Sequence, residues 1–215
     1  MRNHIRAAGL AALLVLGVGV AAAQPPPGSD VPSALALGAS IPMAKTAMIG
    51  VDGKSLSIAA AAGKKGTLVI FMCHHCPWVK AWQDRIATIG NAAAGQGVGA
   101  IAINSNDPGA FPEDDVAGMK EQATQLGLKF PYVVDATSDV ARAFGATRTP
   151  EAFLFDATGK LVYHGTVDDN AHDASAVSKP WLQDAVAAVA GAKAVPTAET
   201  KAFGCGIKFR AKSGT

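Results

Sequence analysis

The sequence predicts an α/β fold, with a central mixed sheet, helices on both faces and an N-terminal β-hairpin. Residues 68–72 are apolar at every position, which is typical of a strand covered on both faces. Strand and helix patterns then alternate, and a second hairpin and a final helix follow, which indicates a sheet covered on both sides. Asp52-Gly53 stands between two short apolar runs, a strong signal for the first hairpin.

Residues 1–23 have the features of a secretory signal peptide. Arg2 and Arg6 make its start positive, and residues 7–20 are apolar but too short for a comfortable membrane span. Small residues end the segment, and cleavage is expected after Ala23, with an uncleaved anchor as the alternative. Cleavage would give a periplasmic or secreted protein with no stable membrane insertion. Disulfides persist in such a compartment.

The mature chain is expected to carry no net charge. The full chain has 19 basic and 17 acidic residues, and residues 1–23 hold two of the basic ones and no acidic one, which leaves 17 of each. No basic run remains, so nucleic acid and anionic membrane surfaces are disfavoured as partners. The expected organisation is a proline-rich linker at 24–34, one globular domain at 35–192, and a tail at 193–215 that carries Cys205.

The helix after the buried strand is expected to begin at Pro77, because a first turn tolerates the missing N–H of proline. Trp78, Trp82, Ile86 and Ile89 follow at spacings of four, four and three, which puts them on one face. Core packing is favoured for Trp82. For Trp78, packing and the shaping of a substrate groove are equally good interpretations.

The middle of the chain predicts another strand and another helix. The strand is expected at 98–103, and the loop at 104–109 is rich in turn-forming residues. Open α/β sheets place their sites at such strand ends, but a solvated turn is the favoured interpretation. Asp114 is interpreted as the N-cap of a helix that ends at Gly127.

The C-terminal half repeats these patterns. Ser138 is interpreted as the cap of a short helix that Gly145 stops, and Ser178 as the cap of a last helix with Pro180 in its first turn. Strands are expected at 130–134, 152–155 and 161–163, the last two forming a hairpin around 156–160.

The stretch Cys73-His74-His75-Cys76-Pro77 carries the chemistry. Two cysteines two residues apart can close a small disulfide ring and reopen it, and the order strand, Cys-x-x-Cys, helix is typical of a redox site. The helix N-terminus is expected to stabilise a thiolate on Cys73, the species that attacks a disulfide. His74 and His75, partly cationic near neutral pH, are expected to add to that stabilisation.

Two other interpretations of the cysteine pair stay open. A copper site would use Cys73, Cys76 and one distant histidine, because soft thiolates favour Cu(I). An inert structural disulfide is the other. Zinc is disfavoured because no second ligand pair stands at metal-ligand spacing, and Pro77 excludes a c-type haem, which needs histidine there. No metal ligand and no cofactor is assigned.

These stretches together resemble the thioredoxin-like superfamily, in the redoxin branch that also holds alkyl hydroperoxide reductase/thiol-specific antioxidant domains and exported thiol-disulfide oxidoreductases. The resemblance rests on residues 68–77, 102–107, 149–150, 153–160 and 204–208, and covers about residues 37–210. It implies a thioredoxin-like domain at 35–192. It also implies that Pro150 is cis beside the cysteine pair, with the neighbouring backbone docking the extended chain of a substrate.

The sequence departs from the family pattern in two places. Thr67 stands where thioredoxins carry a buried aspartate, so water or a side chain such as Glu151 would have to accept the proton of the second thiol. The peroxiredoxin pattern Pro-x-x-x-Thr-x-x-Cys is absent, whether it is read back from Cys73 or from Cys76. Thiol-dependent peroxidase activity is therefore the least favoured function.

The sequence thus predicts an exported thiol-disulfide oxidoreductase, with Cys73 as nucleophile and Cys76 as resolving thiol. A copper-binding or metallochaperone module is the alternative. The expected partners are protein thiols and disulfides as substrates and a redox partner protein, and the direction of electron flow stays open. Cys205, flanked by glycines, is a candidate third redox thiol that could reach Cys73 or Cys76. The alternatives are that it caps a metal, pairs between chains, or stays unpaired and packed against the domain. The residues expected to tune the pair or dock the substrate are His74, His75, Trp78, Thr149 and Pro150.

Overall fold

The computed structural model describes residues 33–211. The expected signal peptide at 1–23 and most of the linker at 24–34 lie outside the described residues. Among the helices of the described part, none combines the length and the hydropathy that crossing a membrane requires.

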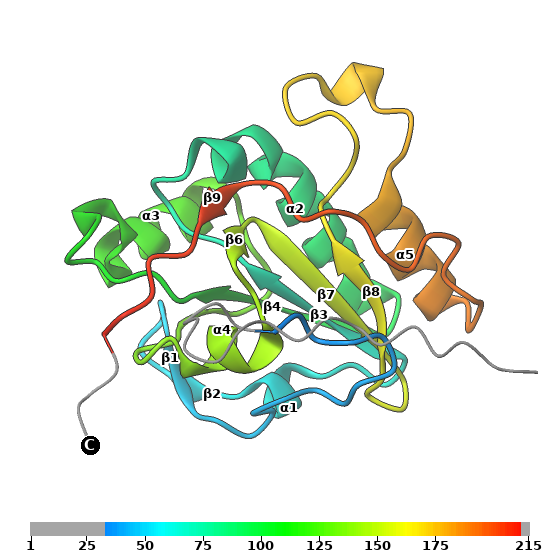
Figure 1. The fold of residues 1–215 in the computed structure, drawn as a ribbon, viewed down its shortest axis with the longest axis horizontal. Helices are drawn as coiled ribbons and strands as arrows, with labels where there is room; N and C mark the ends of the chain where they lie inside the picture. Colours follow the sequence, from blue (N-terminus) through cyan, green and yellow to red (C-terminus); the bar gives the residue numbers. More distant parts are fainter. Residues whose placement is uncertain (1–32, 212–215) are drawn as a thin grey trace, which may run out of the picture.

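A seven-stranded mixed sheet forms the centre of the molecule (Figure 1). Its strands are β1 (Met48–Gly50), β2 (Ser55–Leu56), β3 (Gly66–Phe71), β4 (Val98–Asn104), β5 (Tyr132–Val134), β7 (Glu151–Asp156) and β8 (Leu161–Gly165). Their order is β2-β1-β5-β4-β3-β7-β8. The pairs β3–β4 and β4–β5 are parallel and the other neighbours antiparallel. The predicted mixed sheet and its N-terminal hairpin are therefore confirmed.

The central strand β3 is buried along its whole length. Leu68, for example, pairs with Ala100 of β4 on one side and with Leu154 of β7 on the other. Because helices cover both faces, none of its side chains can reach water, which explains the unbroken apolar run.

Five helices cover the sheet: α1 (Ile58–Ala61), α2 (Pro77–Gly95), α3 (Val116–Gln125), α4 (Asp139–Phe144) and α5 (Trp181–Ala190). The helices α2, α3 and α5 lie on one face, and α1 and α4 on the other (Figure 1). On the second face Phe144 packs edge-on against Phe71 and Phe153, with ring centroids 5.3 and 5.2 Å apart. The sheet is thus the middle layer of three.

The tail after α5 is packed along the domain. It first follows the outer edge of β8, where His164 forms a bridge with Glu199. It then forms β9 (Cys205–Gly206), which pairs with β6 (Arg148–Thr149) in a separate two-stranded unit. Figure 1 shows this red segment passing from α5 over the start of α2.

Two of the predicted helix caps are wrong. Asp115 rather than Asp114 caps α3, and its carboxylate accepts the Gly118 N–H at 2.8 Å. Asp114 cannot serve as the cap because its carboxylate accepts hydrogen bonds from buried donors, which are described below. Ser178 does not cap α5, which begins after Pro180; its N–H and hydroxyl bind the Asp169 carboxylate instead.

Ser138 does precede α4, but its hydroxyl makes no capping hydrogen bond. It donates to the Ser105 carbonyl at 2.7 Å and accepts the Arg210 N–H at 3.0 Å, so it links the helix to the tail.

The interpretation of residues 104–109 as a solvated turn is wrong for its first three residues. Asn104, Ser105 and Asn106 are each no more than 2% exposed. Their side chains reach inward because two buried aspartates, Asp114 and Asp135, need donors there.

Candidate active site

The cysteine motif lies between the end of β3 and the start of α2. Residues 73–75 form the connection, Cys76 is the N-cap of α2, and Pro77 is the first helical residue. The helix N-terminus is therefore at Cys76 and not at Cys73, which corrects the expectation from the sequence. Both Cys73 and Cys76 are 0% exposed.

Thr149 contacts both sulfur atoms. Its hydroxyl lies 3.3 Å from Cys73 Sγ, and its carbonyl oxygen accepts a hydrogen bond from the protonated Cys76 thiol at 3.2 Å. The bond from Thr149 to Pro150 is cis. The structure thus places Thr149 and Pro150 beside the cysteine pair.

Asp114 is a site residue that the sequence reasoning missed. Its buried carboxylate accepts the backbone N–H groups of His74 and His75 at 2.8 and 2.9 Å. The other oxygen accepts the Asn106 side-chain amide at 2.7 Å and pairs with His75 Nδ1 at 2.5 Å. One carboxylate therefore fixes the whole His74-His75 connection. Three adjacent acids at 113–115, soon after the Asn-Ser-Asn stretch at 104–106, were the available signal.

The two histidines of the motif play different structural parts. The ring of His75 stacks on Phe111 at 3.8 Å, and its Nδ1 lies 3.7 Å from Cys73 Sγ. The ring of His74 lies against Gly118 of α3, and its Nδ1 has no hydrogen-bond partner among residues 33–211. Only His75 is therefore placed to act on the Cys73 sulfur.

The surroundings act in opposite directions on the pKa values of the two cysteines. A hydrogen bond from the Cys73 thiol, helped by the Cys205 thiol and by the backbone N–H groups of Val79 and Cys205, lowers the pKa of Cys76 to about 4. The same contact with Cys76, burial and the negative charge of Asp114 raise the pKa of Cys73. These contacts favour a thiolate on Cys76, which the N–H groups at the start of α2 face, whereas the sequence led us to expect one on Cys73.

Trp78 is half-buried at the rim of the site. Its ring centroid lies 4.5 Å from that of Phe203 in the tail and 5.3 Å from that of His172. Trp82, one turn further along α2, is buried in the core, as its spacing predicted. Trp78 thus joins the tail and the 168–178 loop to the surface around the cysteines.

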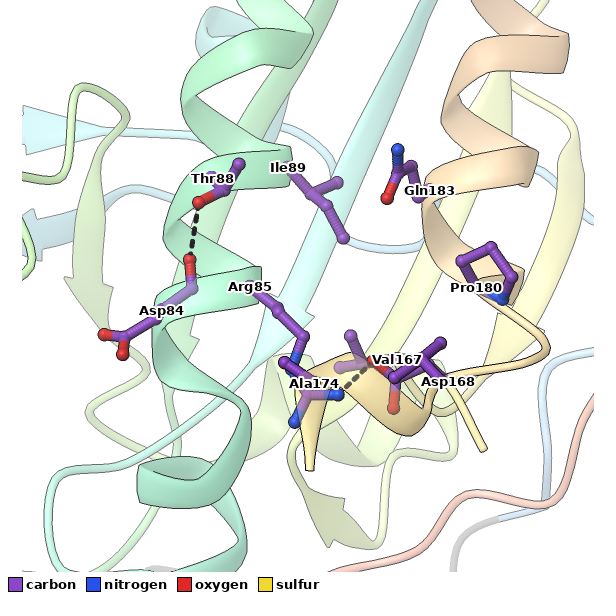
Figure 2. A pocket seen from close by; sticks show the side chains of 10 residues that line it. Asp84, Arg85, Thr88, Ile89, Val167, Asp168, Ala174, Pro180 and Gln183 are labelled. Carbon is purple, nitrogen blue, oxygen red and sulfur yellow. Dashed lines mark hydrogen bonds and ion pairs between the residues drawn. The ribbon is translucent and has the colours of Figure 1, made fainter. Parts of the chain in front are cut away.

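The 168–178 loop is held onto α2 by Asp168. Its carboxylate accepts the Trp82 indole N–H at 2.7 Å and pairs with Arg85 at 2.5 Å. Arg85 also donates to two carbonyls of this loop, at 2.6 Å each. Figure 2 shows Arg85 reaching down from α2 to Asp168, below a pocket of about 300 Å³ between α2 and α5. None of the residues that line this pocket belongs to the cysteine site.

Ligand atoms of Cys73, His75 and Asp114 lie within 4.8 Å of one another, so these three residues could hold a metal ion. The histidine beside the cysteines is therefore His75, and not the distant one that the copper interpretation assumed. The candidate proton acceptor Glu151 is already engaged, since it accepts two backbone N–H groups at 2.8 Å and pairs with His164 at 2.7 Å.

Comparison with known proteins agrees with this arrangement. Residues 36–179 match the family model described as Redoxin. A solved hypothetical protein from Sinorhizobium meliloti 1021 is 34% identical, with a TM-score of 0.76 over 83% of this chain and 97% of the other. A secreted disulfide oxidoreductase of Mycobacterium tuberculosis, 17% identical, shares the fold, with a TM-score of 0.52 over 70% of this chain and 97% of the other.

Among curated proteins, the thiol-disulfide oxidoreductase ResA of Halalkalibacterium halodurans is 27% identical over 112 residues. The matched part is 52% of this chain and 59% of that protein. The family match spans the sheet, the cysteine motif and the cis proline, and the solved relatives have the same architecture. The chain therefore belongs to the redoxin family and has a thioredoxin-like fold.

Proposed function

We propose that this protein is an exported thiol-disulfide oxidoreductase that exchanges disulfides with protein substrates through Cys73 and Cys76. The observation that carries the proposal is the buried cysteine pair at the start of α2, with both sulfur atoms in contact with Thr149 next to cis Pro150. The similarity to proteins named thiol-disulfide oxidoreductase supports the same reaction class.

In the reduced protein the Cys76 thiolate is the proposed nucleophile. It attacks one sulfur of a substrate disulfide, and the other substrate sulfur leaves as a thiolate. Cys73 then loses its proton and attacks Cys76. The Cys73–Cys76 disulfide forms, and the substrate is released with both sulfurs reduced. The reverse sequence oxidises a substrate dithiol.

The test is a titration of the mature protein in glutathione buffers, followed by thiol trapping and intact-mass measurement. The wild type is expected to cycle between a dithiol and one intramolecular disulfide, and Cys73→Ser and Cys76→Ser to lose multiple turnover of insulin disulfides. Turnover retained in Cys76→Ser would refute the proposal. A potential near about −120 to −150 mV would indicate a disulfide donor, and one below about −250 mV a reductase.

Export is a separate part of the proposal and rests on residues 1–23. Protein recovered from the periplasm of an expression host is expected to begin at Gln24. An intact N-terminus on membrane-bound protein would favour the uncleaved anchor.

A copper-binding module is the second candidate, because the ligand atoms of Cys73, His75 and Asp114 lie close together. It predicts stoichiometric Cu(I) binding by the reduced protein in competition with a chelator, and loss of that binding in His75→Ala. Failure of the wild type to compete would remove this candidate.

A further inference from the structure

The C-terminal tail completes the edge of the cysteine site. In the β6–β9 pair, Cys205 lies directly opposite Thr149, the residue that contacts both buried sulfurs. The Ile207 N–H donates to the Thr147 carbonyl at 2.9 Å and continues the pairing. We call residues 203–207 the tail strand. It occupies the backbone edge beside the cis proline (Figure 1).

The tail strand is shaped for this close approach. A Cβ on Gly204 would lie 2.1 Å from the Thr149 carbonyl oxygen and 2.7 Å from the Thr149 carbonyl carbon, so no other residue fits there without displacement of the backbone. On one side of Gly204, the ring of Phe203 packs edge-on against the ring of Trp78, with centroids 4.5 Å apart. Beyond the tail strand, the backbone carbonyl of Lys208 accepts a hydrogen bond from the Asp107 N–H at 2.7 Å.

These contacts bring a third thiol to the buried pair. Cys205 packs against the core cluster that contains Cys73 and Cys76. Its backbone pairs with Thr149, whose carbonyl oxygen accepts the Cys76 thiol at 3.2 Å. Cys73 and Cys76 are 0% exposed, whereas Cys205 is partly exposed. Of the three thiols, Cys205 is therefore the one that both contacts the pair and opens to solvent.

We propose that Cys205 is a third redox residue, which exchanges with the Cys73–Cys76 disulfide to form a Cys76–Cys205 disulfide. This inference rests on the proposed function, because it adds to direct exchange at Cys76 a second, partly exposed route by which the buried pair exchanges with a protein substrate.

The exchange step is balanced without an added oxidant. The Cys205 thiolate attacks the Cys76 sulfur; the Cys76–Cys205 bond forms as the Cys73–Cys76 bond breaks, and Cys73 takes up the proton that Cys205 lost. A thiolate of a substrate dithiol then attacks the Cys205 sulfur, and Cys76 leaves. The second substrate thiolate closes the substrate disulfide and releases Cys205.

The state of Cys76 controls the third thiol. Burial and the hydrogen bond with Cys76 raise the pKa of Cys205 to about 11 in the reduced protein, so Cys205 stays protonated. When Cys76 is held in a disulfide it carries no negative charge, and that contribution disappears. The effect of burial remains, so the pKa of Cys205 is lower, but not normal, when the buried pair is oxidised.

The first test uses Cys73→Ser in the mature full-length protein, which leaves only Cys76 and Cys205. Oxidised glutathione is added, thiols are trapped, and the intact mass and the linked peptides are read. A monomer with an intramolecular Cys76–Cys205 disulfide is the expected product, absent from the Cys73→Ser/Cys205→Ser control. Free thiols, glutathione adducts alone, or linked dimers would overturn the inference.

Two glycines of the tail strand give a matched pair of variants in the Cys73→Ser background. Gly204→Ala is expected to slow closure of the disulfide by about tenfold or more, because its methyl group meets the Thr149 backbone. Gly206→Ala, whose Cβ would have its nearest neighbour 4.0 Å away, at Arg148 Nη1, is expected to stay within about twofold of the parent. Equal rates in the two variants would overturn the geometric argument.

Cys205→Ser in the otherwise native protein separates this inference from the proposed function. Its Cys73–Cys76 disulfide is expected to form, but single-turnover exchange with a peptide dithiol should be slower by about tenfold or more. Exchange at the wild-type rate would overturn the inference and leave the proposed function intact. Failure of Cys73 and Cys76 to form a disulfide in the wild type would instead refute the proposed function.

Discussion

Replacement of Asp114 by asparagine tests how the cysteine connection is held. One carboxylate oxygen accepts two backbone N–H groups, those of His74 and His75, and the other faces His75 Nδ1 and the Asn106 amide. Asparagine keeps one oxygen for the backbone pair. Its amide nitrogen, however, would face two donors, so both side-chain contacts are lost.

The cost of this substitution follows from the two lost contacts. A hydrogen bond to a charged group contributes about 1.5–3 kcal/mol, so Asp114→Asn should lower the free energy of unfolding by roughly 3–5 kcal/mol. The neighbouring Asp115 is the matched control, because it is exposed, accepts one N–H from Gly118, and asparagine caps a helix about as well. Urea unfolding of both reduced variants measures the difference. A gap of less than about 1 kcal/mol between them would contradict the reasoning.

The same substitution should speed the step in which Cys73 loses its proton and attacks Cys76. A carboxylate oxygen of Asp114 lies within 4.8 Å of Cys73 Sγ, and its negative charge helps to raise the pKa of Cys73. Two unit charges at that distance interact by about 3 kcal/mol at an effective dielectric constant of about 20. Loss of the charge should therefore lower the pKa of Cys73 and speed the release of reduced substrate in a single-turnover assay. A rate that is unchanged or slower would refute the electrostatic part.

Four further outcomes are expected. Cys76→Ser should lose the acid-titrating thiolate in ultraviolet absorbance. Cys73→Ala should keep one with a pKa between about 4 and 9.0, since the hydrogen bond donated by residue 73 is lost but the N–H donors remain. Because the pKa of Cys76 is lowered from 9.0 to about 4, the unfolded chain binds that proton more tightly, and the unfolding free energy of the reduced protein should rise with pH between those values. An unfolding free energy, measured by urea denaturation, that does not change with pH in this range would contradict this expectation. Arg85→Met should release the 168–178 loop from α2, seen as several-fold faster proteolysis in that loop with an unchanged core. Ile70→Ala, at a fully buried position, should cost about 2–5 kcal/mol by the same unfolding assay.

Features that depend on neighbours in the chain were predictable from the sequence. The apolar run of β3, the Asp52-Gly53 hairpin and the proline at the start of α2 each express a local rule, and each is found where expected. Gly145, with a φ of +68°, ends α4 for the same reason, because few residues other than glycine adopt that conformation readily.

Features that depend on distant groups were not predictable. Asp114 and Asp115 look alike as helix caps, and only the buried donors around the first decide which carboxylate is drawn inward. The same holds for the two sulfur atoms of the motif, since both contact Thr149, which the fold brings back to the start of α2. The sequence thus located the cysteine pair, and the assignment of the thiolate to one member stays a prediction.

The path of the tail along β8 has a consequence for the solubility of the protein. β8 is the last strand of the sheet, and its His164 donates to the Ala198 carbonyl at 3.0 Å and accepts the Thr200 N–H at 2.9 Å. A chain cut before residue 198 would leave these groups open as an unpaired edge, which is a template for strand pairing between molecules. The tail therefore protects the protein from aggregation, and shortened forms should associate through β8 whether or not Cys205 takes part in the chemistry.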